Sequence, residues 1–227
     1  MAPSSKKEQI DYLLQFISER RKQRFDEVIA ERMNHMRVVL EDIYQAHNAS
    51  AVLRSCDCFG IQYVHFIENR NKYKISDDVA MGSSNWLSIQ RHSEKEQNTL
   101  SCVMELKQQG YRIVATTLHE KDCTLDQLPV DKKFALVFGT EIDGISAQVM
   151  EQADEFVKIP MYGFTESFNI SVCAALCMYE LTEKIRKSGI NYHISEEEKT
   201  DIYLEWLKNS ISKSDLILKE FEDKRAL

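Results

Sequence analysis

Apolar and polar positions alternate along the chain in two different periods, which predict helices at both ends and strands between them. Near the start, apolar residues recur at helical spacing, namely Ile10, Leu13, Leu14, Ile17, Phe25, Val28 and Ile29. Short apolar runs typical of buried strands follow at 38–40, 63–67, 112–117, 135–138 and 156–159. A further strand at the edge of the sheet is expected within 86–89.

The segments between these runs predict helices that connect parallel strands. Residues 48–59 form one such helix, with Asn48 as its expected N-cap and Gly60 as its end. Residues 95–109 form a second, polar helix that ends at Gly110. Strands that alternate with helices over more than a hundred residues indicate an α/β fold, with a mostly parallel sheet covered on both faces. Ligands of such sheets bind at the carboxyl ends of the strands.

Two helices are expected in the last sixty residues. Residues 170–181 are nearly apolar all round, which predicts a helix buried on most sides. Its small residues Cys173, Ala174, Ala175 and Cys177 allow close approach of another element, such as a second subunit. The segment Ser195 to Glu198 has the capping-box pattern and opens a helix expected to run to about Phe221.

Composition narrows the class of protein. The chain has 227 residues, of which 43% are hydrophobic, and its formal net charge is −7, which excludes a globally basic nucleic-acid binder. The run from Arg20 to Arg24 is the strongest local positive charge, although a solvated helix face is its default interpretation. No stretch approaches the ~20 apolar residues of a membrane span, so we expect no membrane association. The scattered cysteines favour a reducing, cytoplasmic location. Neither they nor the histidines show metal-ligand spacing, and no metal is expected.

Three segments could carry chemistry. The first, 48–60, contains Arg54 in an otherwise apolar helix, where it needs a partner. That partner is either Asp57, at i+3, or the phosphate of a ligand.

The second segment, 136–146, is a strand that runs into Gly139, with Glu141 and Gly144 following. Two glycines around a carboxylate allow a sharp turn and close approach of a ligand, but this is not a P-loop. The third segment, 159–171, offers polar side chains and free N–H groups at the start of a helix, which suit a polar ligand. Taken singly, the second segment is also explained by an ordinary strand-to-helix turn and the third by N-capping.

Together, in this order and spacing, the three segments resemble the motifs of the SpoU/TrmH branch of the SPOUT superfamily. The first motif, Asn then Arg six residues later and a closing Phe-Gly, is similar to 48–60. The second, Gly-x-Glu-x-x-Gly, is similar to 139–144, and the third, Ile-Pro-Met followed by Ser-Leu-Asn-Val-Ser, is similar to 159–171 with Phe168 in place of Leu. The resemblance covers roughly residues 20–190.

This resemblance implies a fold and an activity. The fold would contain a deep C-terminal trefoil knot at about 134–185, which no sequence pattern alone suggests. Residues 37–190 would form the methyltransferase domain of a homodimer, with a helical RNA-binding arm at 1–36 and a helical extension at 191–227. The activity would be S-adenosylmethionine-dependent 2′-O-methylation of a ribose in tRNA, at guanosine 18 of the D-loop as in the TrmH branch. The alternatives are a 2′-O-methyltransferase of ribosomal RNA and a knotted RNA-binding factor without catalysis.

The resemblance also implies roles for individual residues. Arg54 would be catalytic, either as a base or, since arginine is not normally deprotonated, as a phosphate clamp. The residues ordering the site around it would be Asn48, Glu141, Ser167 and Asn169. The adenosine pocket would be lined by Thr116, Leu118, Gly139, Ile159, Met161 and Phe168. The candidates for RNA contact are Arg20, Arg21, Lys22, Arg24 and Arg32.

Overall fold

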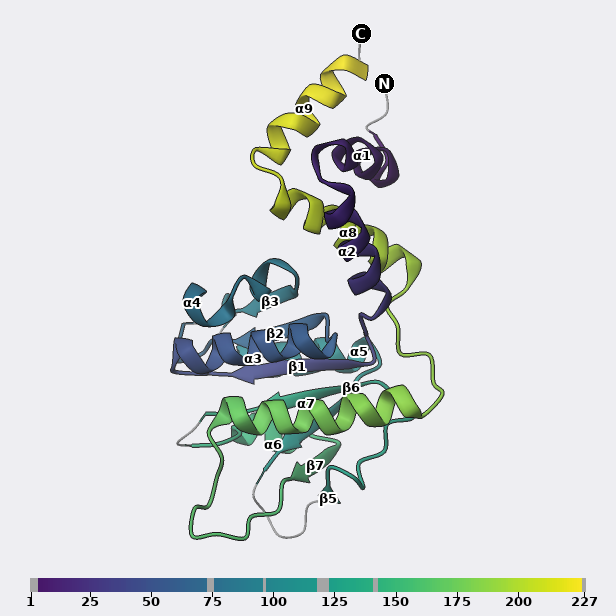
Figure 1. Ribbon diagram of the computed structural model, residues 1–227. Helices are drawn as coiled ribbons and strands as arrows, with labels where there is room; N and C mark the ends of the chain where they lie inside the picture. Colours follow the sequence, from purple (N-terminus) through teal and green to yellow (C-terminus); the bar gives the residue numbers. More distant parts are fainter. Residues whose placement is uncertain (1–3, 73–75, 96, 118–122, 141–142, 226–227) are drawn as a thin grey trace. The chain divides into compact units, whose positions relative to one another are not determined.

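A computed structural model describes residues 4–72, 76–95, 97–117, 123–140 and 143–225 (Figure 1). The chain divides into two compact units. One unit joins the two ends, Met1–Arg32 and His193–Leu227, and the other is formed by Met33–Tyr192.

The unit Met33–Tyr192 is built on a seven-stranded sheet in which every neighbouring pair of strands is parallel. Its strands are β1 (Met36–Glu41), β2 (Tyr63–Ile67), β3 (Ser88–His92), β4 (Arg112–Thr116), β5 (Cys123–Thr124), β6 (Phe134–Phe138) and β7 (Glu155–Lys158). The order across the sheet is β3-β2-β1-β6-β4-β7-β5. The predicted parallel α/β fold is therefore confirmed. The short edge strand β5 was missed because two residues carry no periodicity.

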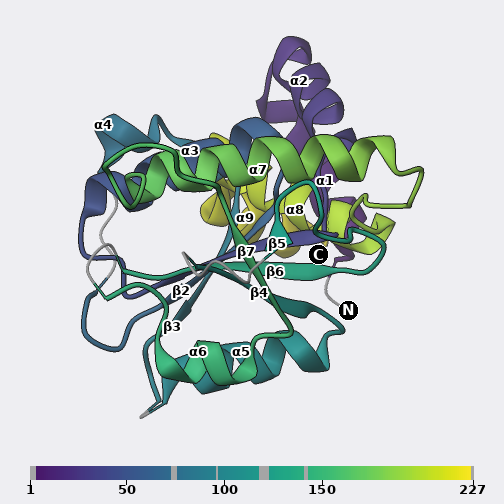
Figure 2. The ribbon, with the colours of Figure 1, turned by 90° about the horizontal axis from the view of Figure 1, so that it is seen from below.

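Helices cover both faces of this sheet, as Figure 2 shows. The longer helices α3 (Ala46–Phe59) and α7 (Ile170–Lys187) lie on one face, and α5 (Asn98–Gln108) and α6 (Ala147–Gln152) lie on the other. The short α4 (Asp77–Ala80) and the 3-10 turn η2 (Ser83–Asn85) lie between β2 and β3 in the sequence and pack against α3. Alternate side chains of the central strands point to opposite faces, so the sheet has a separate apolar core on each side.

The start of α3 differs from the prediction. The helix begins at Ala46 with Gln45 as its N-cap, so Asn48 lies inside the first turn and the N-cap assignment was wrong. The predicted end is confirmed, because Gly60 adopts the left-handed conformation with φ of 78°.

The terminal unit consists of helices α1 (Lys6–Leu13), α2 (Glu19–Ala30), α8 (Glu196–Ser210) and α9 (Ser214–Arg225), with a 3-10 turn η1 (Leu14–Phe16). The Tyr12 ring stacks on Phe221, with centroids 4.4 Å apart, and joins the two ends of the chain. The capping box at Ser195 is confirmed. The single long helix is not, because the chain turns between α8 and α9, where Lys213 has a φ of 60°.

Helix α7 has one buried and one exposed apolar face. Ala174, Cys177 and Met178 are buried in the core that α3 also lines. Val172, Leu176 and Tyr179 form an exposed stripe at i, i+4 and i+7, with relative exposures of 46%, 41% and 58%. The prediction that this helix is buried on most sides is therefore wrong for the single chain. The trefoil knot at 134–185 stays a prediction.

Candidate functional site

The sheet brings three of the predicted cofactor residues to one edge. Thr116 is the last residue of β4, Gly139 follows β6 and Ile159 follows β7. Because β6, β4 and β7 are neighbours and parallel, their carboxyl ends lie side by side. The Thr116 hydroxyl donates to the carbonyl of Val137, at 2.9 Å, and ties the ends of β4 and β6 together. The structure thus forms the sheet edge at which parallel α/β folds bind ligands.

The loop after β6 is closed on itself. The backbone N–H of Thr140 donates to the carbonyl of Gly144, at 2.9 Å, and the N–H of Gly144 donates back to Thr140, at 3.1 Å. A Cβ atom on Gly139 would lie 2.1 Å from the carbonyl oxygen of Gly144, so only glycine fits there. Glu141, predicted to order the site, lies outside the described residues.

A buried carboxylate anchors the far end of this loop. Glu41, at the end of β1, accepts hydrogen bonds from the backbone N–H and the hydroxyl of Ser146, at 3.0 and 2.7 Å. It also accepts from the hydroxyl of Thr99 on α5, at 2.7 Å, and it is 2% exposed. Ser146 in turn caps α6. Sequence reasoning missed Glu41, because a lone acidic residue at the end of an apolar run gives no signal.

The neighbouring residue Asp42 organises a second loop. One of its carboxylate oxygens accepts from the backbone N–H groups of Asn69, Arg70 and Asn71, at 2.7, 2.8 and 3.3 Å. The Arg70 guanidinium then donates to Asp143, at 3.0 Å, and this partner raises the pKa of the arginine. The loops after β2 and β6 are thereby linked. Asp42 was not singled out in the sequence.

The first and third motifs meet at two asparagines. The side-chain amide of Asn169 donates to the side-chain oxygen of Asn48, at 3.2 Å. Asn169 is also the N-cap of α7, where it accepts from the backbone N–H of Ser171 at 2.9 Å. Residues 121 positions apart are therefore held together at the start of two packed helices.

Arg54 lies apart from this pair. The side chain of Arg54 is exposed to solvent. It therefore avoids the free-energy cost of a buried, unpaired charge, which the apolar residues around it in the sequence predict. Six positions along a helix place it about 120° around α3 from Asn48. Among the described residues Arg54 forms no hydrogen bond or ion pair, and the expected pair with Asp57 is not found. Its guanidinium is open to a ligand from solvent.

Three of the remaining predicted site residues lie in a single long loop. Met161, Ser167 and Phe168 lie in the segment without regular structure between β7 and α7, and Phe168 is 41% exposed. Leu118 lies outside the described residues. The segment therefore contributes side chains from one long loop rather than from a rigid element.

The predicted RNA-contact residues, which lie on α2 and just after its end, divide into two groups. Arg20, Arg21 and Arg24 are exposed and Lys22 is partly exposed. Arg32 is 1% exposed, and its guanidinium lies 5.4 Å from the centre of the Trp206 ring. Because its side chain does not reach the surface of this chain, its assignment to RNA contact is wrong.

A groove of about 380 Å³ lies beside α7 and is mainly apolar. Ile159 is the one predicted cofactor residue in its lining, which consists of Thr124, Leu125, Asp126, Ile159, Pro160, Leu176, Tyr179 and Glu180. The groove joins the residues that end or follow β5 and β7 to part of the exposed α7 stripe, namely Leu176 and Tyr179. No helix in the described parts of the chain is long and apolar enough to cross a membrane.

Comparison with known proteins gives the class to which this fold and site belong. Residues 35–179 match the model of the SpoU rRNA Methylase family, and the chain belongs to that family. Within the family, its relatives include a tRNA (guanosine(18)-2′-O)-methyltransferase of Borreliella burgdorferi, 42% identical over 202 residues, covering 89% of this chain and 91% of the relative. The enzyme of the same name from Aquifex aeolicus is 32% identical over 200 residues, covering 87% and 93%.

A solved structure supports the same family membership. The crystal structure of the A. aeolicus TrmH/SpoU tRNA modifying enzyme superposes with a TM-score of 0.77 at 30% identity, covering 86% of this chain and 98% of that one. AviRb of Streptomyces viridochromogenes, solved in complex with AdoMet, shares the fold, with a TM-score of 0.58 at 22% identity over 72% of this chain and 62% of that one. The predicted membership of the SpoU/TrmH family is confirmed.

Proposed function

We propose that this chain is an S-adenosylmethionine-dependent methyltransferase of the ribose 2′-oxygen of guanosine 18 in tRNA. The observation that carries the proposal is the Asn48–Asn169 contact, which joins the first and third family motifs. The second motif lies at the carboxyl end of β6, the strand beside β1, which leads into α3. The relatives that bear the guanosine-18 name match this chain over nearly its full length.

The strand-end residues fit the cofactor by their chemistry. Thr116 and Gly139 would bring backbone groups close to an adenosine, and Ile159, Met161 and Phe168 would supply the apolar contacts that exclude water from it. S-adenosylmethionine supplies an electrophilic methyl group. The protein's task is then to hold the ribose oxygen in line with that group and to assist removal of its proton.

Arg54 suits the role of a phosphate clamp. A guanidinium is planar, always protonated and able to bind two phosphate oxygens at once. Its positive charge beside the reacting nucleotide lowers the pKa of the 2′-hydroxyl, so a weaker base suffices. Exposure and the absence of a partner among the described residues leave it available for this contact.

A homodimer accounts for the exposed face of α7. A stripe of Val172, Leu176 and Tyr179 costs free energy in water, and a second copy of the same helix would bury it at an isologous interface. Leu176→Asp is expected to convert the dimer to a monomer in light scattering after size exclusion. Leu216→Asp, at a 57% exposed site on α9, is the matched control and should leave the mass unchanged.

The exposed basic residues of α2 are proposed to contact tRNA phosphates. Replacing Arg20, Arg21 and Arg24 by Gln is expected to weaken tRNA binding and to flatten its salt dependence. The log–log slope should fall by up to about 0.9 for each phosphate that is no longer neutralised. The control replaces Lys132 and Lys133, which are exposed beside the amino end of β6 and so at the opposite edge of the sheet from the site. An unchanged slope in the arginine variant would indicate that the basic residues 20–24 are only a solvated helix face.

The deciding experiment combines labelled S-adenosylmethionine with an unmodified tRNA transcript and maps the methylated ribose. Label at the D-loop guanosine is expected. Label on ribosomal RNA alone would retain the chemistry and change the substrate. Absence of transfer to either RNA, with cofactor and tRNA still bound, would support the non-catalytic RNA-binding factor instead.

A further inference from the structure

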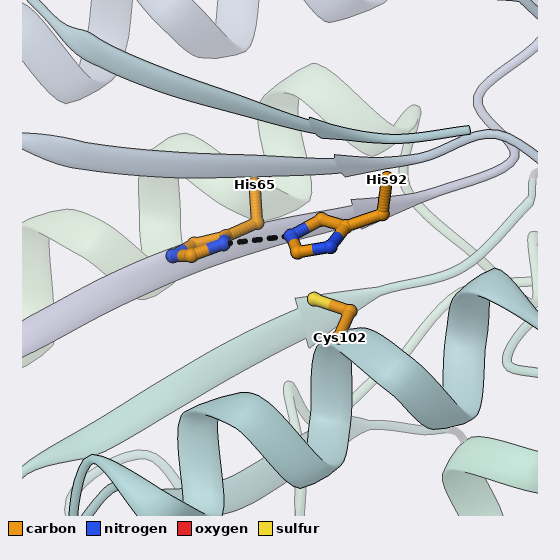
Figure 3. A group of neighbouring side chains, drawn as sticks. All are labelled: His65, His92 and Cys102. Carbon is orange, nitrogen blue, oxygen red and sulfur yellow. Dashed lines mark hydrogen bonds between the residues drawn. The ribbon is translucent and has the colours of Figure 1, made fainter. Parts of the chain in front are cut away.

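A cluster of two histidines and one cysteine lies within the sheet, away from the predicted site residues. His65 belongs to β2, His92 to the neighbouring edge strand β3, and Cys102 to α5, which covers them (Figure 3). All three are buried, with relative exposures of 2%, 9% and 0%. One ring nitrogen of each histidine and the Cys102 sulfur lie within 4.8 Å of one another. The proposed methyl transfer uses none of them.

The two imidazoles face each other directly. Nδ1 of His65 lies 3.1 Å from Nε2 of His92, and the rings are close to parallel, at 20°. Only one of these two nitrogens can carry the shared proton, so the other presents a lone pair. Burial lowers the pKa of His65 to about 3 and also lowers that of His92, so both rings are neutral near pH 7.

We propose that His65, His92 and Cys102 form a binding site for a zinc-like divalent cation. Neutral imidazole and thiolate are the donors that zinc prefers, and three protein donors leave a fourth position for a further ligand. Tetrahedral zinc at about 2.0–2.3 Å from nitrogen and sulfur needs donors about 3.3–3.7 Å apart. In the observed cluster the two nitrogens lie 3.1 Å apart and no pair of donor atoms is more than 4.8 Å apart, so shifts of about 1 Å or less would bring them to that spacing.

Binding of the cation requires no oxidation or reduction. The cation takes the place of the proton between the rings, and the histidine that carried this proton moves it to its outer nitrogen by a change of tautomer. The Cys102 thiol loses its proton to solvent, since the thiolate is the metal ligand. Two nitrogen–metal bonds and one sulfur–metal bond replace one hydrogen bond and one S–H bond.

The charges around the cluster act in both directions. Burial raises the pKa of the Cys102 thiol, and the nearby carboxylates of Glu105 and Glu41 raise it further, so the thiolate forms only with the cation bound. Once the cation is bound, the same two carboxylates offset the positive charge that remains. Arg37 opposes it, acting on both His65 and Cys102. Glu41 already accepts hydrogen bonds from Thr99 and Ser146, so it contributes charge rather than a ligand atom.

The experiment titrates untagged full-length protein, stripped with EDTA, with Co²⁺ and follows the thiolate-to-cobalt absorption. One equivalent is expected to bind the unaltered protein. Cys102→Ser and His92→Gln should each lose the absorption, because each removes one donor. Cys56→Ser is the matched control, since Cys56 is equally buried, on the opposite face of the sheet, and should bind as the unaltered protein does.

A second measurement uses Zn²⁺ at 100-fold above its dissociation constant. The unfolding midpoint is expected to rise by roughly 5–10 °C and to fall back with EDTA. In the Cys102→Ser and His92→Gln variants the shift should vanish. Absence of cobalt absorption in folded protein, or a Zn²⁺ shift that both variants retain, would overturn the proposal and leave the histidines as a hydrogen-bonded pair of the core.

Discussion

Gly139→Ala tests whether the loop after β6 forms the cofactor site. The added Cβ would lie 2.1 Å from the carbonyl oxygen of Gly144, where real contacts stay above 3.0 Å. The backbone must therefore move by about 0.9 Å, and it loses the two hydrogen bonds between Thr140 and Gly144. Those bonds together contribute roughly 1–3 kcal/mol.

Two other glycines provide matched controls. Gly144 has a φ of 69° and no atom within 4 Å of a Cβ, so Gly144→Ala carries only the conformational cost, about 1–2 kcal/mol. Gly163 has no close neighbour and no positive φ, so Gly163→Ala is expected to be neutral. The three substitutions add the same methyl group at sites that differ in space and backbone angle.

The assay is calorimetric titration with S-adenosylmethionine, with thermal unfolding measured in parallel. The loss of those two hydrogen bonds corresponds to a fall in affinity of roughly 5- to 150-fold in Gly139→Ala. A smaller fall is expected in Gly144→Ala and none in Gly163→Ala. Equal affinity in Gly139→Ala and Gly163→Ala, with both proteins folded, would refute the reasoning and place the cofactor elsewhere.

Three further outcomes are expected. Arg54→Ala should abolish methylation and leave the cofactor affinity and the mass of the dimer unchanged. Retained turnover would show that Arg54 is not catalytic. Ser195→Ala should destabilise the terminal unit by about 1 kcal/mol in denaturant titration, because it removes the capping box of α8, and a smaller loss would mean that the cap is dispensable. Burial and the hydrogen bond to Asp26, at 2.9 Å, raise the pKa of Tyr203. The contribution of Tyr203 to the free energy of unfolding should therefore be full below about pH 10, the pKa of tyrosine in the unfolded chain, and should be lost as the pH rises from there through the raised pKa of the folded state. Tyr203→Phe should remove this part of the loss at high pH. Identical curves of stability against pH for the two proteins would contradict the assignment.

The sequence predicted the parts of the fold that depend on local pattern. The central strands are continuous apolar runs because both faces of the sheet are covered, and glycine marks the end of α3 in the expected way. The three motifs could be located because their residues are close in sequence.

Long-range packing decided what the sequence could not predict. Nothing local indicates that Arg32 is buried against Trp206, or that the exposed side of α7 remains apolar in the single chain. Nor does spacing reveal His65, His92 and Cys102, which come from three elements. The two histidines converge through strand pairing, and Cys102 joins them through the packing of α5 on the sheet.

Glu41, the last residue of β1, and Asp42, which follows it, have a consequence for engineering. Glu41 fastens the start of α6 through Ser146, and Asp42 fastens the loop whose Arg70 reaches Asp143. A designer who transplants the 139–146 loop into another parallel sheet, or exchanges it with a homologue's, would move only part of the unit that gives the loop its shape. The acidic pair and the 69–71 segment must be transferred with it, and recombination between homologues should succeed only at boundaries that keep all three together.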